Sequence, residues 1–441
     1  MIFKSFRKRA INDSALFINP VLLNSFTQYI CSEVFQPLQK IIYQLTLSIF
    51  KNKFRLFKII LLVFSCFFFI SSACQAQQDS CHIRISLLTA TPGEELYSTF
   101  GHSALRVTDT ARNTDIVYNY GTFNFDEPNF YLKFVRGKLP FYLSTDNFDN
   151  FMAEYRYENR GVTEQILNLT CEEKANIQMM LMVNMMGNNR GYKYDFTFDN
   201  CTTRLRDLIE KASDSTVNFG QVLHTKMTFR NLIYEYLNKN DKQWSKLGID
   251  ILLGSRMDVA ATPYQVMFLP EYLMKTFDSS TIDGRPLVLE EQSLIRQRHT
   301  GEIKNNLTHP FFLFVCLFVL IAFLSFSKNK STQKILASFD GFLFFITGLL
   351  GILVLFMWFG TDHYMCRDNL NILWAWPPNI IAAFYIHSKK KWARNYFLVY
   401  ALFNILLIIS WKFIPQHFNV SLLPIICLLI FRSLIFTLGK K

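Results

Sequence analysis

The chain has 441 residues, of which half are hydrophobic and 45 are Phe, and its formal net charge is +12. This composition is too apolar for a purely soluble protein and leaves room for one globular domain together with membrane spans. Lys and Arg cluster beside apolar runs, as the positive-inside rule requires, so the charge does not indicate a nucleic-acid partner. The nine cysteines form no CxxC pair and no Cys/His spacing typical of a tetrahedral site, and we expect no metal and no cofactor.

The first 76 residues divide into two parts. Residues 1–50 are an N-terminal extension without a clear period, to which we assign no function. Residues 51–76 predict a signal sequence or anchor, because the basic stretch KNKFRLFK precedes an apolar run at 59–73 of the length of a signal h-region. The following SSACQAQQD permits cleavage after Ala76, lipid attachment at Cys74, or retention as an anchor. In all three cases the rest of the chain is exported.

Residues 77–309 contain no apolar run of membrane length and predict one exported α+β domain. Strand patterns occur at 83–89, 103–107, 116–120 and 162–169, and a short helix is expected at 128–135. The sequence Thr170-Cys171-Glu172-Glu173 is a capping box and predicts a helix that runs to about residue 186. Cys171 and Cys81 are both exported, so the two could form a disulfide.

Residues 310–441 predict an all-α bundle of about five transmembrane helices, at 311–326, 335–360, 370–386, 395–410 and 420–438. Basic loops at 328–334 and 389–394 and the basic C-terminus lie at alternate ends, so all three are expected in the cytoplasm. The exported domain and the loops at 361–369 and 412–419 then share the outer side. Asp340 lies about two turns inside the cytoplasmic end of the second span, where an acid is costly unless it is paired, so a structural pair is expected. Pro377 and Pro378 are expected to bend the third span.

The stretch DFTFDNCTTRLRDLIEK, residues 195–211, has the strongest chemical signal. Leu205, Leu208 and Ile209 recur at helical spacing, so a helix is expected to start at Cys201 with Asp199 or Asn200 as its cap. The helix N-terminus and nearby arginines favour the thiolate form of such a cysteine. This is how thiol nucleophiles are presented, although a buried structural cysteine fits the local pattern equally well.

A thiol nucleophile needs a base, and the stretch FGHSALRV offers His102 at the start of a strand. The next strand carries YNY, where Asn119 could accept a hydrogen bond from the second ring nitrogen and orient the imidazole. Cys201, His102 and Asn119 are therefore the expected catalytic residues. The alternative for His102 is a packing residue of the strand.

Four longer motifs carry a resemblance to a known family. SLLTATPGEELYSTFGHSALRV, YNYGTFNF, YDFTFDNCTTRLRD and TDHYMCRDNLNILWAWP resemble the Lnb-type lipoprotein N-acyltransferases, over roughly residues 80–440. The order of histidine strand, orienting residue and later Asn-Cys helix also resembles the circularly permuted papain-like fold of the NlpC/P60 and lecithin:retinol acyltransferase group. The family match carries over His102 and Cys201 as the catalytic pair.

The resemblance implies a membrane-bound acyltransferase that moves an acyl chain from a phospholipid, through a Cys201 thioester, to the N-terminal amine of diacylated lipoproteins. It implies a location in the inner membrane with the catalytic domain on the periplasmic side. Asn200, Arg204, Asp362 and His363 are the expected substrate-binding residues, although Asp362 and His363 also fit simple interfacial polar positions. The alternatives are a cysteine amidase or peptidase that acts on cell-wall peptides, and a non-catalytic membrane sensor or scaffold.

Overall fold

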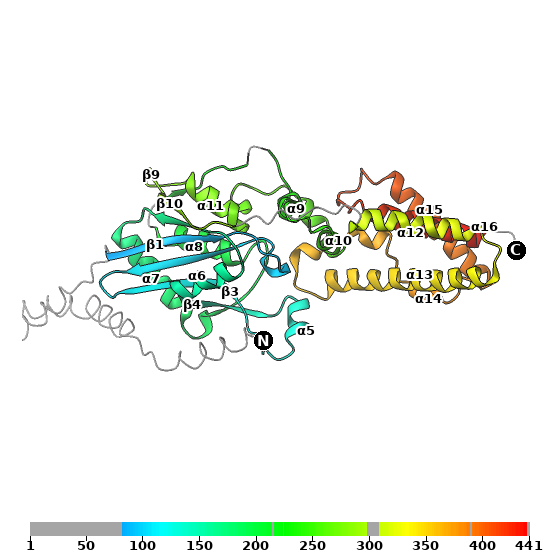
Figure 1. Cartoon of the computed structure of the whole chain (residues 1–441), viewed down its shortest axis with the longest axis horizontal. Helices are drawn as coiled ribbons and strands as arrows, with labels where there is room; N and C mark the ends of the chain where they lie inside the picture. The colour runs from blue at the N-terminus through cyan, green and yellow to red at the C-terminus, as the bar shows by residue number, and fades with distance from the viewer. Residues whose placement is uncertain (1–81, 214–215, 224, 298–307, 389, 439–441) are drawn as a thin grey trace, which may run out of the picture. The chain divides into compact units, whose positions relative to one another are not determined.

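The computed structural model describes residues 82–213, 216–223, 225–297, 308–388 and 390–438 (Figure 1). The chain divides into the units Met1–Asp79 and Ser80–Lys441, and every described residue lies in the second. The predictions for 1–50 and for the signal sequence or anchor at 51–76 lie outside the described residues. Cys171 is disulfide-bonded, and its expected partner Cys81 also lies outside them.

The exported domain is built on an antiparallel sheet of seven strands in the order β10-β5-β1-β2-β3-β4-β6. Strands that are consecutive in the segment 83–147 are antiparallel neighbours in the sheet, and the shortest connection, residues 110–113, joins β2 and β3. A second, three-stranded sheet joins β7, β8 and β9. The strands are β1 Ile83–Ala90, β2 His102–Asp109, β3 Thr114–Thr122, β4 Pro140–Asn147, β5 Val162–Leu167, β6 Gly191–Lys193, β7 Val217–Asn218, β8 Thr281–Ile282, β9 Arg285–Pro286 and β10 Val288–Ile295.

Helices cover both faces of the larger sheet, because successive strand residues point to opposite faces. On β1, Ile85 and Leu87 face a core shared with α8, whereas Leu88 and Ala90 face a second core shared with α6. α7, α8 and α11 therefore share one face, and α6 covers the other (Figure 1). The helices of this domain are α5 Phe130–Val135, α6 Phe148–Tyr157, α7 Cys171–Met185, α8 Cys201–Ala212, α9 Phe229–Lys239, α10 Gln243–Leu252 and α11 Pro270–Asp278, and its 3-10 turns are η3 Leu96–Ser98, η4 Gly187–Asn189, η5 Ser255–Asp258 and η6 Gln265–Phe268.

The α+β class of the exported domain is confirmed, and the circular permutation stays a prediction. The expected strands correspond to β1, β2, β3 and β5, and the expected helices to α5, α7 and α8. The capping box is present, since Thr170 Oγ1 accepts from the Glu173 amide while Glu173 accepts from the Thr170 amide. Strands β4 and β6, helix α6 and the elements of the domain beyond α8 were not predicted from the sequence.

The C-terminal region is helical and strongly apolar. In the described part of the chain, α13 and α15 are long and apolar enough to cross a membrane, whereas α12 and α16 are apolar but shorter. Two 3-10 turns and one short helix lie between α13 and α15. The elements are α12 Pro310–Ser325, α13 Lys330–Phe359, η8 Tyr364–Cys366, η9 Leu370–Leu373, α14 Asn379–Ala383, α15 Lys391–Ile409 and α16 Leu422–Leu438.

The expected third span at 370–386 is not one continuous helix. It consists of η9, a break at 374–378 and the short helix α14. Pro377 and Pro378 lack backbone N–H groups, and their rings exclude the helical hydrogen bonds on their N-terminal side, so they break the helix and do not merely bend it. The broken segment packs closely on α13, where Gly348 and Gly351 leave no room for a Cβ.

Asp340 has the partner that its position within α13 requires. Arg432 of α16 forms two hydrogen bonds with the Asp340 carboxylate, each 2.6 Å long, and both side chains are buried. His387 lies 3.7 Å from the same carboxylate. The pair joins two apolar helices, which confirms the expectation of a structural pair.

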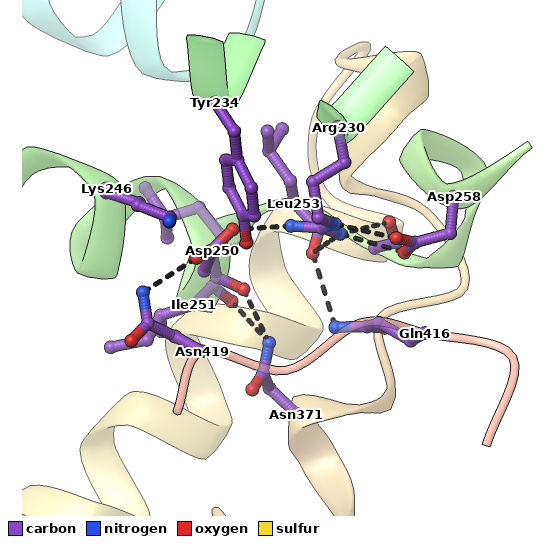
Figure 2. A network of polar contacts seen from close by, with 12 residues as sticks. Arg230, Tyr234, Lys246, Asp250, Ile251, Leu253, Asp258, Asn371, Gln416 and Asn419 are labelled. Atoms are coloured by element: carbon purple, nitrogen blue, oxygen red, sulfur yellow. Dashed lines mark hydrogen bonds and ion pairs between the residues drawn. The ribbon is translucent and has the colours of Figure 1, made fainter. Parts of the chain in front are cut away.

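A buried polar network joins the exported domain to the outer loops of the helical region (Figure 2). Asp250 of α10 accepts from Arg230 at 2.7 Å, from Tyr234 at 2.6 Å and from Asn419 at 2.8 Å. Asn371 donates to the Asp250 backbone carbonyl at 2.8 Å. Arg230 and Asp250 are both fully buried. We call this set the Asp250 junction, and because each charge is paired, it holds the two regions in one arrangement.

Candidate functional site

Cys201 is the first residue of α8, and Asn200 is the N-cap. Asn200 Oδ1 accepts from the amides of Thr202 at 3.0 Å and Thr203 at 2.9 Å. Its Nδ2 donates to the carbonyls of Phe196 and Phe268. Asn200 is 2% exposed and its side-chain amide makes all four of these contacts, so it positions Cys201, and its role in substrate binding stays a prediction.

His102 opens β2 directly after Gly101, whose φ is +86° and whose missing Cβ leaves room for the Ala90 carbonyl. Its Nε2 lies 3.2 Å from Oδ1 of Asn119 on β3. The hydrogen bond expected between these two residues is therefore present. Because Oδ1 can only accept, the neutral ring carries its proton on Nε2 and leaves Nδ1 as the basic nitrogen.

The thiol lies where β2 and β3 separate. Pairing between these strands ends at Leu105 and Tyr118, and beyond that point the Ser103 backbone N–H donates to the Cys201 thiol. The thiol is thus bound at Ser103, the residue that follows His102 on β2. Gly121 of β3 lies against it, since a Cβ built on this glycine would be 3.7 Å from the Cys201 Cβ. That distance is an ordinary van der Waals contact, and it is the φ of +91° at Gly121 that disfavours a side chain here.

Both reactive groups are neutral at rest. Burial lowers the pKa of His102 to about 4, and although the Asn119 hydrogen bond raises it, Arg160 lowers it further. Burial also raises the pKa of the Cys201 thiol, and the amides of Ser103, Thr202 and Cys201 offset only part of that effect. The expectation of a resting thiolate is wrong, because desolvation outweighs the helix N-terminus.

Arg204 contributes less positive potential than the sequence implied, because it has a partner of its own. Its guanidinium forms two hydrogen bonds with Asp199, at 2.6 and 2.8 Å, and lies 3.5 Å from the centre of the Tyr192 ring. Arg206 is likewise paired, with Asp207. In this arrangement Arg204 packs against Tyr192 at the side of the site, and a substrate would have to compete with Asp199 for the Arg204 guanidinium.

Asp362 and His363 lie in the outer loop after α13 and contact the exported domain. Asp362 pairs with Lys193 at 2.8 Å, and this partner lowers the pKa of the carboxyl. His363 Nε2 lies 3.2 Å from the Phe134 carbonyl. The Asp362 amide donates to the Arg136 carbonyl at 2.9 Å. The loop is therefore anchored to two segments that flank the site, next to α5 and on β6.

The same loop also reaches the segment that leads into α8. The Tyr364 ring packs on Phe198, with centroids 5.6 Å apart, and Asp368 pairs with Arg256 at 2.7 Å. Phe198 immediately precedes Asp199 and the Asn200 cap. The expectation that residues 361–369 lie close to the thiol segment is consistent with these contacts.

Two tyrosines of the site were not foreseen. Tyr192 and Tyr194 lie near enough to Cys201 for its charge to raise the pKa of each, although burial is the larger cause. Tyr194 stacks on Phe141 of β4, with centroids 4.4 Å apart. The alternation in GYKYDF could have placed both tyrosines on one face of a strand, but not beside the thiol. Within the described residues, no group of three or more His, Cys, Asp or Glu side chains is arranged to hold a metal.

The fold and the site together define a membrane protein whose exported α+β domain presents a helix-start cysteine beside a histidine–asparagine pair. Two family profiles match the chain: the Lnb N-terminal periplasmic domain matches residues 71–236, and the Lnb transmembrane domain matches residues 302–441. The chain belongs to the Lnb-type lipoprotein N-acyltransferase family, and it is a membrane protein with a periplasmic domain. No match was found among the curated proteins or the solved structures.

Proposed function

We propose that the protein is a lipoprotein N-acyltransferase of the inner membrane that uses Cys201 as its nucleophile. The observation that carries this proposal is the position of the thiol, hydrogen-bonded at Ser103 beside the His102–Asn119 pair. Membership of the Lnb family supplies the reaction class. The pair supplies a base and its orienting residue, which a cysteine acyltransferase requires.

In the first half-reaction, Cys201 Sγ attacks the ester carbonyl of a phospholipid while its proton passes to Nδ1 of His102. The carbon–oxygen bond then breaks, and the imidazolium returns the proton to the glycerol oxygen, so a lysophospholipid leaves and the acyl chain remains as a thioester. The amides of Ser103 and Cys201 are the donors offered to the oxyanion, because the Thr202 amide is bound to Asn200 Oδ1. A neutral pair fits this step, because the substrate ester carries no charge at its carbonyl.

In the second half-reaction, the N-terminal amine of a diacylated lipoprotein attacks the thioester. Its proton passes through His102 to the departing sulfur, so an amide forms and the Cys201 thiol is regenerated. Asn119 keeps the ring in the Nε2–H tautomer throughout and acts as a positioning residue. Water must be kept away between the two steps, and Cys201 and His102 are each only partly exposed.

We propose supporting roles for the four residues that were expected to bind substrate. Asn200 caps α8, and Arg204 pairs with Asp199. Asp362 and His363 hold the outer loop against the periplasmic domain. In the proposal, these residues shape the site and fix its height above the lipid, while both substrates remain in the outer leaflet and reach the thiol without transfer into water.

The test is transfer by full-length protein in vesicles of phosphatidylethanolamine with isotope-labelled acyl chains, using a synthetic diacylglyceryl-cysteine peptide as acceptor. We expect a labelled triacylated peptide by mass spectrometry. Cys201→Ala should abolish it. Cys316→Ala, which removes an exposed thiol of α12, should leave it unchanged. Cleavage of cell-wall peptides without transfer would favour the amidase or peptidase, and neither reaction would favour a sensor or scaffold.

A further inference from the structure

Helix α5 has an unusual surface for a helix of a periplasmic domain. None of its six residues is buried, although five of them are aromatic or aliphatic. Tyr131 is 81% exposed, Leu132 57% and Phe134 50%. Large apolar side chains gathered on one short exposed helix indicate a surface that contacts something apolar.

The contacts of α5 place it next to the membrane helices. The Phe134 carbonyl is bound by His363, and the Arg136 carbonyl by the Asp362 amide. Both partners follow the outer end of α13 within four residues. That end carries Trp358 and Phe359, which stack on each other, and aromatic residues of this kind mark the interface between a membrane and water. The end of α5 is thus bound to the loop that follows the outer end of α13.

Basic side chains lie near Asp362, in the segment that follows α5 and on β6. Arg136, Lys138 and Lys193 are near enough to Asp362 to lower the pKa of its carboxyl, with Lys193 as the largest contributor. One carboxylate faces three cations here, so the local charge is positive. A positive rim around an apolar surface is the arrangement that receives a lipid, with phosphate at the rim and acyl chains against the apolar groups.

A continuous row of aromatic rings leads from α5 to the thiol. Neighbouring centroids are 6.2, 5.8, 5.3 and 4.4 Å apart. A Cβ built on Gly121 would lie 3.9 Å from the Tyr194 ring and 3.7 Å from the Cys201 Cβ, so the last ring and Cys201 both lie beside the same glycine. Apolar rings therefore extend over the whole distance between α5 and the thiol site. The row consists of Phe134, Phe130, Phe123, Phe141 and Tyr194.

We propose that α5 is the lipid contact of the periplasmic domain, and that one acyl chain of an outer-leaflet phospholipid passes over it along the aromatic row to Cys201. This inference rests on the proposed function for the chemistry at the thiol, but the contact between α5 and lipid stands apart from it. The exposed face of α5 then lies in the outer leaflet, and the basic rim binds the headgroup phosphate.

The matched test compares two double substitutions in full-length protein reconstituted in phosphatidylethanolamine vesicles. Tyr131→Ser with Leu132→Ser removes the α5 surface. Tyr157→Ser with Leu289→Ser removes side chains of the same types that are 84% and 69% exposed elsewhere on the domain. We expect the α5 pair to lower acylation of Cys201 from vesicle phospholipid at least about tenfold, and the control pair to leave it unchanged. Acylation by p-nitrophenyl acetate, a small soluble donor, should stay within about twofold in both.

Three outcomes would overturn the proposal: an unchanged vesicle rate in the α5 pair, an equal loss in the control pair, or an equal loss with the soluble donor. A second measurement needs no catalysis. Photo-crosslinking with vesicle phosphatidylethanolamine that carries a diazirine on its acyl chain should label α5 at Tyr131, Leu132 or Phe134. Labels confined to the helices after residue 309 would contradict the contact. Labelled α5 without any acylation of Cys201 would instead refute the proposed function and leave the lipid contact standing.

Discussion

Cys201 and His102 are themselves neutral, whereas the Asp250 junction is built from buried full charges. At the thiol site, burial keeps the imidazole unprotonated and the thiol protonated. At the junction, Arg230 is bound by Asp250 at 2.7 Å and by Asp258 at 2.9 Å, with no exposure of the guanidinium. The two regions therefore differ in what each can lose. A neutral group can be removed without stranding a charge, but removal of one junction carboxylate leaves a buried cation short of a partner.

The thiol site is expected to serve the reaction, whereas the Asp250 junction is expected to hold the periplasmic domain in place. Substitutions at the site should affect turnover and leave the fold intact, whereas substitutions at the junction should affect the fold first. The junction also joins α9 and α10 to the loops that carry Asn371 and Asn419 (Figure 2). A loss there should loosen the periplasmic domain from the membrane helices and reduce transfer indirectly.

The largest effect is expected at the site itself. Cys201→Ser and His102→Ala should each lower transfer to the lipopeptide by at least about a thousandfold, because each removes a reacting group. The thermal midpoint should stay close to that of the native protein, since neither change strands a charge. Transfer assays and thermal unfolding of the same preparations check both halves. Native-like transfer in either variant would break the catalytic assignment.

The next effect is on stability. Asp250→Ala should destabilise the protein by about 3–5 kcal/mol, because Arg230 stays buried with one carboxylate where it had two. Asp278→Ala, at an exposed position at the end of α11, is the control and should change stability by less than about 0.5 kcal/mol. Unfolding curves in one detergent give the comparison. Equal stability of the two variants would show that the junction does not hold the regions together.

A smaller effect concerns pH. Because the pKa of His102 is about 4, the base form persists below the ordinary range of histidine, and kcat/KM should fall only as pH drops through about 4. Asn119→Asp places a carboxylate against the ring, which favours the imidazolium, raises the pKa and moves the acidic limb to higher pH. Profiles with the soluble donor measure the shift. An acidic limb near 6.5 in the native protein would contradict the buried neutral imidazole.

The smallest effect concerns thiol reactivity. Burial raises the pKa of Cys201, so iodoacetamide should modify it at pH 7 more slowly than it modifies the cysteine of a free peptide of the same local sequence, by about tenfold. The rate should continue to rise with pH beyond the point where the peptide rate levels off. Faster modification than in the peptide would restore the thiolate that the sequence alone indicated.

The features that could be predicted from the sequence are those that depend on a few neighbouring residues, and the features that could not be predicted depend on contacts between distant residues. The helix start at Cys201 and the strand start at His102 could be predicted because capping and strand alternation act over a few residues. The Asn119 contact could be predicted as well, since β2 and β3 form a hairpin. The thiol pKa could not, because it depends on burial by Tyr192, Tyr194 and other residues that reach the site only through the fold.

The membrane half shows the same limit. Apolar length identified the helical region, but the break at Pro377 and Pro378 depends on whether neighbouring helices can satisfy the freed backbone groups. The Asp250 junction was not foreseen because its members come from four separate elements or loops. The sequence also did not show whether Asn200 caps α8 or binds substrate, since an amide side chain next to the thiol fits both roles. That distinction required its bonds to Phe196 and Phe268.

The most direct measurement is the mass of the Cys201 peptide after full-length protein is incubated with phosphatidylethanolamine vesicles and no acceptor. We expect this peptide to gain the mass of one acyl chain in thioester linkage, which hydroxylamine releases. The added mass should disappear when the diacylglyceryl-cysteine peptide is added, and it should be absent from His102→Ala. An unmodified thiol in protein that nevertheless transfers the acyl chain, or a chain attached to another residue, would contradict the proposed mechanism.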